Sequence, residues 1–166
     1  MIKKINIEKI KVCDAFNKGE NFEHSKRVVK LCKYYAKVLG IDKNKKNLLI
    51  RAAWLHDIGK IQDINKHHNR NIVINSLNKI KYDSDDINVI VDIIENHRSE
   101  FEPSNYILEC GILRICDKLD KYNKDKPEKA RKKCLENLQI ILDYMKNKIS
   151  YIDLFIFKTI SMNLIK

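Results

Sequence analysis

The sequence contains few residues that interrupt helices, with only four glycines and two prolines among 166 residues. A protein of many short strands needs more turn residues than this, so we expect an all-α fold. Long hydrophobic runs are also missing, because no stretch of about 18 apolar residues occurs. The first residues, MIKKINIEKIKVC, lack both an unbroken apolar stretch and a small-residue cleavage site. These absences predict a cytoplasmic protein that does not insert into a membrane.

The five cysteines form no Cys-x-x-Cys pair and lie mostly among apolar residues. This pattern favours buried, reduced thiols over disulfides or thiolate metal sites. The length suits one domain with one hydrophobic core. Because no long linker, repeat or low-complexity block interrupts the chain, we predict a single domain over residues 1–166.

The chain carries a net charge of +11, from 33 basic and 22 acidic residues. Such an excess attracts polyanions, including nucleotides, RNA and acidic protein surfaces. Lysines scattered along a sequence are also typical of a solvated surface. The charge alone therefore does not identify a ligand.

Apolar residues recur at helical spacing along the whole chain. The pattern predicts an opening helical segment over about 7–19, further helices over about 21–40, 48–57, 64–80, 87–97, 103–117 and 130–145, and an apolar tail over 151–166. Acidic residues at 83–86 would cap the helix that follows them, and Pro103 would occupy a first helical turn. The tail is apolar enough to pack on the bundle or on a second subunit, so a homo-oligomer through this segment is a further expectation.

Seven side chains that can bind a metal lie at or near the apolar faces of the predicted helices: His24, His56, Asp57, His67, His68, His97 and Asp117. One histidine on an apolar face is more often a hydrogen-bonded core residue than a ligand. An ionised carboxylate in a core, however, is costly unless it meets a cation or hydrogen-bond donors. Several inward histidines and carboxylates on separate helices can converge on one point inside a bundle. The set therefore predicts a metal site at the centre of the fold.

His56 and Asp57 are adjacent, and neighbours on a regular helix diverge by about 100°. Both can serve one site only where the helix ends, and Gly59 predicts such an end. Imidazole and carboxylate ligands without thiolates suit Mn, Fe, Zn, Co or Ni, and carboxylates also accept Mg. Because the two oxygens of an aspartate can bridge two ions, we expect one or two divalent ions.

The choice between His67 and His68 depends on helical phase. If the helix runs through both, His67 lies seven residues before Ile74 and ten before Leu77, on their inward stripe. His68 is rotated by about 100° from that stripe. We therefore predict His67 as the ligand and place His68 behind it or on the substrate side, although an irregular helix start would remove this argument.

Four segments, EHSKRV, LHDIGK, IIENHRS and ICDKLD, place the donors in the order H, HD, H and D. Over about residues 20–123 the sequence resembles the HD superfamily of metal-dependent phosphohydrolases, including its HDIG-like subset. The resemblance implies an HD-type helical bundle with the metal site in its centre, on which helices of about 126–166 pack. HRSEFEPSN followed by ICDKLDKYN is also similar to small bacterial HD hydrolases that act on nucleotides. The GYP signature of the cyclic-di-GMP enzymes is absent from the sequence.

The resemblance also implies roles for individual residues. The metal ligands would be His24, His56, Asp57, His67, His97 and Asp117. Asp57, or another acid behind the ligands, would in addition orient the attacking water, and Lys60 would contact the substrate phosphate and assist catalysis. Arg27 and Arg98 would bind the substrate, with simple surface exposure as the alternative for Lys60 and Arg98.

The implied reaction is hydrolysis of a phosphoester or phosphoanhydride bond in a nucleotide or similar small molecule by metal-activated water. A metal-dependent nuclease is the alternative that the positive charge favours, with nucleic acid as the partner. A non-catalytic signalling module that keeps the fold and the metal is a third reading. The intact set of ligands argues against this third reading, because a module without turnover has no need for all of them.

Overall fold

The computed structural model describes residues 21–82, 85–97, 105–124 and 128–165. These residues form α-helices and one short 3₁₀ helix, with no strand among them, which confirms the expected all-α fold. In chain order the helices are α3 (Asn21–Val38), α4 (Lys43–Leu55), η1 (Ile58–Ile61), α5 (Arg70–Lys79), α6 (Ile87–Asn96), α7 (Ile107–Lys124), α8 (Glu128–Met145) and α9 (Tyr151–Ile165). The helix predicted over 7–19, Cys13, Asp83, Ser84, Arg98 and Pro103 lie outside the described residues.

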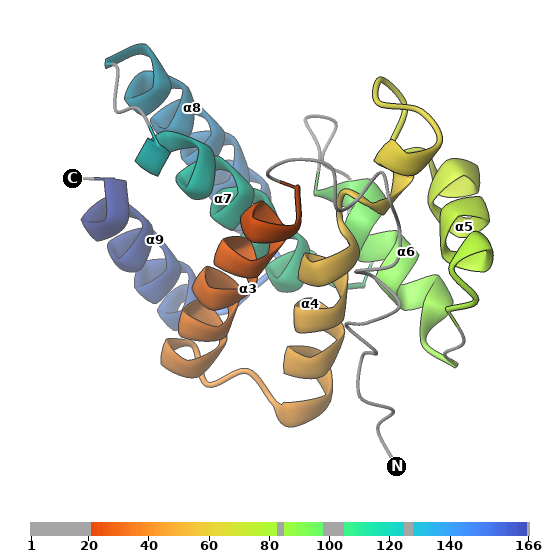
Figure 1. Ribbon diagram of the computed structural model, residues 1–166. Helices are drawn as coiled ribbons and strands as arrows, with labels where there is room; N and C mark the ends of the chain where they lie inside the picture. Colours follow the sequence, from red (N-terminus) through yellow and green to blue (C-terminus); the bar gives the residue numbers. More distant parts are fainter. Residues whose placement is uncertain (1–20, 83–84, 98–104, 125–127, 166) are drawn as a thin grey trace.

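Helix α7 lies at the middle of the bundle (Figure 1). It packs against α3, α4 and α6, and its other side contacts α8 and α9. The pairs α3 with α4 and α4 with α6 also pack on each other, while α5 covers η1 and α6. Side chains of α7 such as Ile112, Leu113 and Leu119 are fully buried in this core. The helices that carry the predicted metal ligands therefore meet around α7.

Local signals join α3 to α4 by a short turn. Gly40 adopts a φ of 63° after the last turn of α3, a conformation that glycine reaches without strain. The N–H of Ile41 then donates to the carbonyl of Ala36 at 3.0 Å. Asp42 caps α4, because its Oδ1 accepts from the backbone N–H of Asn44 at 2.9 Å.

Two predicted helix boundaries are wrong. The helix expected over 64–80 begins at Arg70, because Asn69 caps it by accepting from the N–H of Asn71 at 3.1 Å. Residues 64–69 are therefore a loop. The helix expected to end at Asp117 continues to Lys124, since neither glycine nor proline follows Asp117 before that point and the buried stripe goes on.

The cap expected from the acidic residues before α6 does not form at Asp86. Asp86 occupies the N-cap position of α6 but makes no side-chain cap hydrogen bond. Its carboxylate instead accepts from the guanidinium of Arg51 at 2.8 Å, which ties the start of α6 to α4. An ion pair with a distant residue has replaced the local cap.

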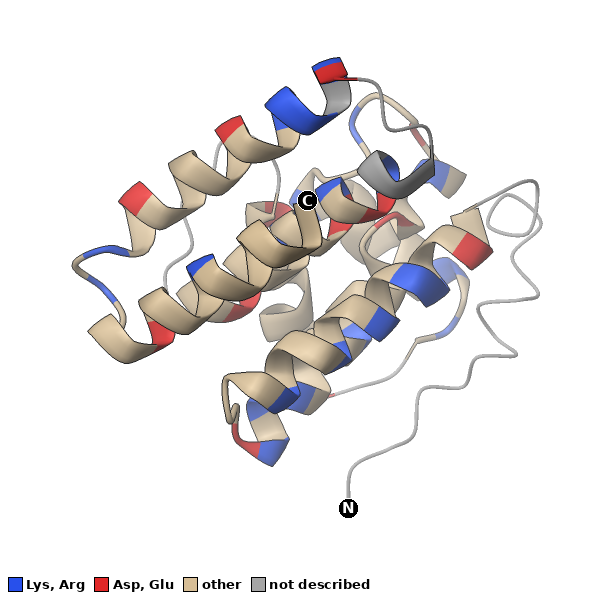
Figure 2. Ribbon diagram, turned by 90° about the vertical axis from the view of Figure 1, so that its left-hand side faces the viewer, with Lys and Arg blue, Asp and Glu red and all other residues tan. Residues whose placement is uncertain are grey.

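The C-terminal helix α9 packs on the bundle, as the apolar tail predicted. The hydroxyl groups of Tyr35 in α3 and Ser161 in α9 are hydrogen-bonded at 2.7 Å, and Phe157 packs on the ring of Tyr35. Few charged positions lie along α9 (Figure 2), and its outer side leaves Tyr151 and Phe155 exposed. A homo-oligomer through this segment stays a prediction.

The four described cysteines, Cys32, Cys110, Cys116 and Cys134, are buried and free, which agrees with the expected role of small core residues. Burial raises the pKa of the Cys134 thiol to about 11, so this thiol is protonated at neutral pH. None of the described helices combines the length and the apolar character needed to cross a membrane.

Candidate metal centre

Separate elements of the bundle bring the predicted metal ligands to its centre. They are His24 in the first turn of α3, His56 and Asp57 at the end of α4, His67 and His68 in the loop between η1 and α5, His97 at the end of α6, and Asp117 in α7. All of them are buried except His67 and His68, which are partly exposed. The structure thus brings together every described residue that was predicted as a ligand.

The end of α4 allows adjacent residues to face the same point. His56 is the C-cap residue directly after the last residue of α4, and Asp57 follows it with the non-helical angles φ −100° and ψ 7°. In consequence Asp57 Oδ2 lies 3.6 Å from His56 Nε2. Gly59 lies in η1 and has an additional role, because a Cβ there would overlap the carbonyl group of His67. Glycine permits the loop that carries His67 to approach the site.

The donor atoms lie close to one another. The Nε2 atoms of His24 and His56 are 3.2 Å apart. His24 Nε2 lies 3.1 Å from Asp117 Oδ1 and 3.8 Å from Asp57 Oδ2. Asp57 Oδ1, on the other side of this carboxylate, lies 3.4 Å from His67 Nε2.

These atoms make two groups that share Asp57. One group contains His24, His56 and Asp57, the other contains Asp57, His67 and His68, and the ligand atoms of each group lie within 4.8 Å of one another. Each group is able to hold a metal ion. His97 adjoins both groups, since its ring centroid is 5.4 Å from that of His56 and 4.5 Å from that of His68.

In four imidazoles the Nδ1 atom is held by a hydrogen bond, which leaves Nε2 available. The Nδ1–H groups of His56, His67 and His97 donate to the backbone carbonyls of Ala53, Ile64 and Ile94 at 2.9, 2.5 and 2.5 Å. His24 Nδ1 donates to the carboxylate of Asp120 at 2.7 Å. In the neutral form of each ring, Nε2 then carries the lone pair that a metal ion needs. Histidines that bind metals are generally oriented by such second hydrogen bonds.

Asp120 is a buried carboxylate that the sequence reasoning did not single out. It lies one helical turn after Asp117 on α7 and is 3% exposed. Besides His24, it accepts from Arg27 Nε at 2.7 Å and from Arg27 Nη2 at 3.1 Å. The Asp-x-x-Asp spacing in ICDKLD was the available signal, because residues three apart share a helix face.

Burial and charge hold the imidazoles near the loop neutral. Burial lowers the pKa of His56, and it lowers the pKa of His97 well below the usual value of histidine. Burial, and then the neighbouring His67, lower the pKa of His68 to about 3. For His24 the effect of burial is opposed and outweighed by the nearby carboxylates of Asp117 and Asp120, so its pKa is raised. Neutral imidazole is the form that binds metals.

The two carboxylates of the centre are ionised in spite of burial. Burial alone would raise the pKa of Asp57, but His56, His67 and Lys60 outweigh it and lower this pKa. Lys60 Nζ contacts Asp57 Oδ2 at 2.5 Å. The pKa of Asp117 is likewise lowered, because its contacts with nearby histidine and lysine side chains outweigh burial.

One buried oxygen shows that these residues suit a cation. Asp117 Oδ1 is buried and, among the described residues, receives no hydrogen bond of ordinary geometry, although the ammonium of Lys121 lies 2.8 Å away as an ion pair. It faces the lone-pair side of His24 and His56, at 3.1 and 3.8 Å from their Nε2 atoms. A cluster of imidazole nitrogens and carboxylate oxygens is a donor set for a divalent transition metal or, with its carboxylates, for Mg. The residues present therefore fit a divalent ion.

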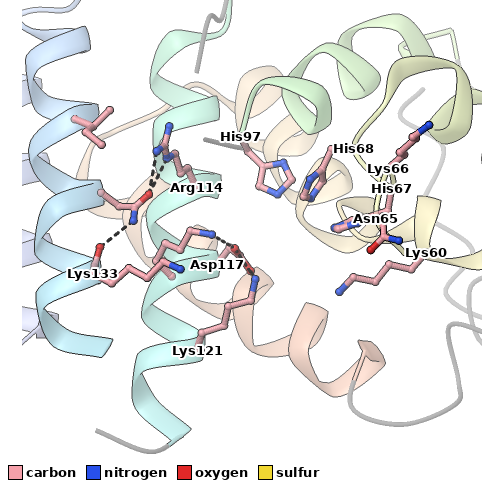
Figure 3. Close-up of a pocket in the computed structure, with 13 residues that line it drawn as sticks. Lys60, Asn65, Lys66, His67, His68, His97, Arg114, Asp117, Lys121 and Lys133 are labelled. Carbon is pink, nitrogen blue, oxygen red and sulfur yellow. Dashed lines mark hydrogen bonds and ion pairs between the residues drawn. The ribbon is translucent and has the colours of Figure 1, made fainter. Parts of the chain in front are cut away.

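A cavity of about 640 Å³ opens beside these donors (Figure 3). Its lining includes His67, His68, His97 and Asp117 together with the basic residues Lys60, Lys66, Arg114, Lys118, Lys121 and Lys133. Such a volume lies in the range of small-molecule sites, about 300–1,000 Å³. The cavity joins metal-binding side chains to a positively charged wall.

The profile of the HD domain matches residues 21–122, which contain every described donor. The chain belongs to the HD domain family. Members of this family are metal-dependent hydrolases, so the HD domain places the histidines and aspartates above in a known type of metal-binding bundle.

Curated relatives with the same region are named Ribonuclease Y. Over 123 residues this chain is 35% identical to the protein of Mycoplasma mycoides and 33% identical to that of Mycoplasma capricolum subsp. capricolum. These matches cover 71% of this chain but only 27% and 23% of the two relatives. The chain thus spans about a quarter of the relatives it matches. No solved structure matches the HD domain chain significantly.

The residues predicted to bind substrate lie in different places. Lys60 lines the cavity and contacts Asp57. Arg27 is held by Asp120 and lines a separate surface cavity beside Trp54. Arg98 lies outside the described residues. Lys118 and Lys121, which sequence reasoning did not select, line the cavity and contact Asp117.

Proposed function

We propose that this HD domain hydrolyses a phosphoester or phosphoanhydride bond in a nucleotide or a similar small phosphorylated molecule. The observation that carries the proposal is the common orientation of the four imidazoles, whose Nδ1–H groups are all bound elsewhere. Core histidines satisfied at random would not leave Nε2 free in this way, and in three of these rings, His24, His56 and His67, Nε2 lies within 3.8 Å of the ionised carboxylate of Asp57. The basic residues that line the adjoining cavity could bind a phosphate group, which supports the same reaction.

The proposed ligands are His24, His56, Asp57, His67, His97 and Asp117. The ions would be Mn, Fe, Ni, Co, Zn or Mg, one or two in number, and Asp57 would be shared between the two donor groups. The hydrogen bond from His67 Nδ1 to Ile64 supports His67 over His68 as a ligand. Among the described residues, His68 makes no comparable bond, so we place it beside the ions on the cavity side.

When bound, a divalent ion activates water and stabilises charge on the phosphoryl oxygens. The residues of the chain supply the rest. Asp57 orients the attacking water, and Lys60, which lines the cavity, compensates the charge that develops on the phosphate. Arg27 acts indirectly, because it holds Asp120 and thereby the ring of His24.

The test combines metal analysis with a panel of nucleotides and small phosphate esters. The wild-type protein should bind a divalent ion and release phosphate or pyrophosphate from at least one member of the panel. Asp57→Ala should lose both metal and turnover while circular dichroism shows an unchanged helix content. Lys60→Ala should keep the metal and lose about 100-fold in turnover, since lysine is a phosphate-binding charge and not a ligand. Metal binding without any turnover would favour a signalling module instead.

A metal-dependent nuclease is the second candidate, and the relatives named Ribonuclease Y favour it. The net charge of +11 fits a polyanionic substrate. Cleavage of single-stranded RNA or DNA in the presence of Mn, abolished in Asp57→Ala, would support this reading. Turnover confined to the small molecules of the panel would reject it.

A further inference from the structure

One face of α7 carries both a metal-binding carboxylate and a row of positive charges. Arg114, Asp117, Lys118 and Lys121 follow one another at intervals of three, one and three residues, so they share one side of the helix. All four line the cavity, together with Lys133 of α8. Figure 3 shows Arg114, Lys121 and Lys133 across the opening from Lys60 and Lys66. The α7–α8 wall is thus a second positive region, separate from Lys60.

Two of these lysines now share the carboxylate of Asp117. Lys118 Nζ lies 3.0 Å from Asp117 Oδ2. Lys121 Nζ lies 2.8 Å from Asp117 Oδ1 and 2.9 Å from Oδ2. His24 Nε2 approaches the same Oδ1 from the side of the metal centre at 3.1 Å. Asp117 therefore stands between the metal donors and the lysines.

A cation on Asp117 would weaken the hold of the carboxylate on the two ammonium groups. It would take up the charge of the carboxylate and repel Lys118 and Lys121, which would be like charges at short range. Their side chains are 28% and 56% exposed, and a lysine stem is flexible enough to turn into the neighbouring cavity. Arg114 remains in place behind them, because its Nε and Nη2 donate to Asn137 Oδ1 at 3.3 and 2.9 Å.

We propose that Lys118 and Lys121, with Lys133, form a second phosphate subsite that becomes available when Asp117 is neutralised. This inference rests on the proposed function and specifies its substrate class. The substrate carries a further phosphate next to the one that is cleaved, in a pyrophosphate linkage or in a neighbouring phosphodiester. The cavity of about 640 Å³ is lined both by the donors His67, His97 and Asp117 and by these three lysines.

The first test measures binding of inorganic pyrophosphate and inorganic phosphate to the Mn-loaded protein by calorimetry. The wild type should prefer pyrophosphate. Lys118→Ala/Lys121→Ala should weaken pyrophosphate binding by about tenfold or more, as expected for lost charge-assisted hydrogen bonds, and change phosphate binding little. Lys132→Ala is the matched control, because Lys132 is exposed on α8 next to Lys133 and is not part of the cavity lining. An equal loss for both anions, or no loss for either, would overturn the subsite.

The second test needs neither metal nor turnover. In Asp117→Asn a neutral amide replaces the carboxylate, so the metal-free variant should bind pyrophosphate more tightly than the metal-free wild type. Adding Lys118→Ala and Lys121→Ala should remove this gain. If the gain is absent or survives in the triple variant, the subsite is wrong. A protein that passes this test but hydrolyses no member of the panel would contradict the proposed function alone.

A third measurement separates the two sources of the second phosphate. ADP and a 5′-phosphorylated dinucleotide are compared as ligands of the Mn-loaded wild type and of the double lysine variant. A larger loss for ADP assigns the subsite to a pyrophosphate linkage, and a larger loss for the dinucleotide assigns it to a neighbouring phosphodiester. Either result supports the subsite, whereas unchanged binding of both ligands contradicts it.

Discussion

Each imidazole of the centre owes its orientation to the partner of its Nδ1. For His56, His67 and His97 that partner is the carbonyl three residues earlier, so the orientation follows from the local backbone. For His24 the partner is Asp120, which lies on another helix. The ring of His24 is therefore the one whose orientation depends on a single replaceable side chain.

We expect Asp120→Ala to weaken metal binding by about 10- to 100-fold, the usual effect of losing the carboxylate that orients a ligand. The helix content should not change, because Asp120 contributes no apolar packing. Isothermal titration with Mn measures the affinity. Asp120→Asn should restore part of the metal affinity, since its amide oxygen can still accept from His24 Nδ1. Asp143→Ala, on the exposed side of α8, serves as the control. Wild-type affinity in Asp120→Ala would contradict the positioning role.

The two histidines of the loop between η1 and α5 also differ in whether Nδ1 is held by a backbone carbonyl, as it is in His67. We expect His67→Ala to lower the number of bound ions, because its Nε2 is held 3.4 Å from Asp57 Oδ1. His68→Ala should leave metal content near that of the wild type. Elemental analysis after dialysis measures both. The opposite pattern would exchange the roles of these residues, and no loss in either would restrict the centre to the ligands around His24.

At the scale of elements, the loop between η1 and α5 depends on one close approach. The backbone of His67 lies so near Gly59 that any side chain at position 59 would overlap it. The carbonyl of Gly59 in η1 also accepts hydrogen bonds from the backbone N–H groups of Gln62 and Asp63. The position of the loop histidines is thus set by η1, not by α5.

We expect Gly59→Ala to move the loop away from Asp57 and to reduce the binding of the ion that needs His67. The group made by His24, His56 and Asp57 should keep its ion, because α3 and α4 are not displaced. Metal stoichiometry falling toward one ion, with a lower Tm, would confirm this. Gly40→Ala provides a contrasting variant: its φ of 63° is strained for alanine, so it should lower Tm without lowering stoichiometry.

The elements differ in how well the sequence predicts them. The buried stripes of α3 and α8 follow directly from residues such as Val28, Leu138 and Ile141, because a regular helix repeats its inward face. The start of α5 was predicted too early because the apolar spacing of the helix was extended back past its cap, Asn69. The close approach of His67 to Gly59 could not be predicted, since it joins segments whose relative position depends on the tertiary fold.

The candidate site was predictable to a similar degree. The inward donors could be selected because charged groups on apolar helix faces need a partner. Asp120 and Lys121 were missed, since their importance comes from contacts with His24 and Asp117 rather than from a distinctive neighbour in sequence. Arg27 pairs with Asp120, a contact that the sequence did not indicate, and its role in binding the substrate phosphate stays a prediction.

At the scale of the whole molecule, one buried acid makes stability depend on pH. Glu109 in α7 is 2% exposed, and burial raises its pKa. The folded state disfavours the ionised form of Glu109, so ionisation lowers the free energy of unfolding. This loss of stability is absent below about pH 4.3, the pKa of an unfolded glutamate, and is complete above the raised pKa of the folded state. Glu109→Gln should therefore raise Tm at pH 7 and leave it nearly unchanged at pH 4. A variant with the wild-type difference between the two pH values would contradict this assignment.

The hydrogen bond between His24 and Asp120 joins residues 96 positions apart, and the contact between His24 and His56 spans 32 positions. Such a centre exists only after most of the chain has folded, so an ion bound there has no comparable site in the unfolded chain. By mass action, free metal at about 100 times its Kd would add about 2.7 kcal/mol to the free energy of unfolding. The Tm should rise with metal concentration, and release of the ion should coincide with loss of helical circular dichroism. The metal content of this protein would then report directly on the cooperativity of its unfolding.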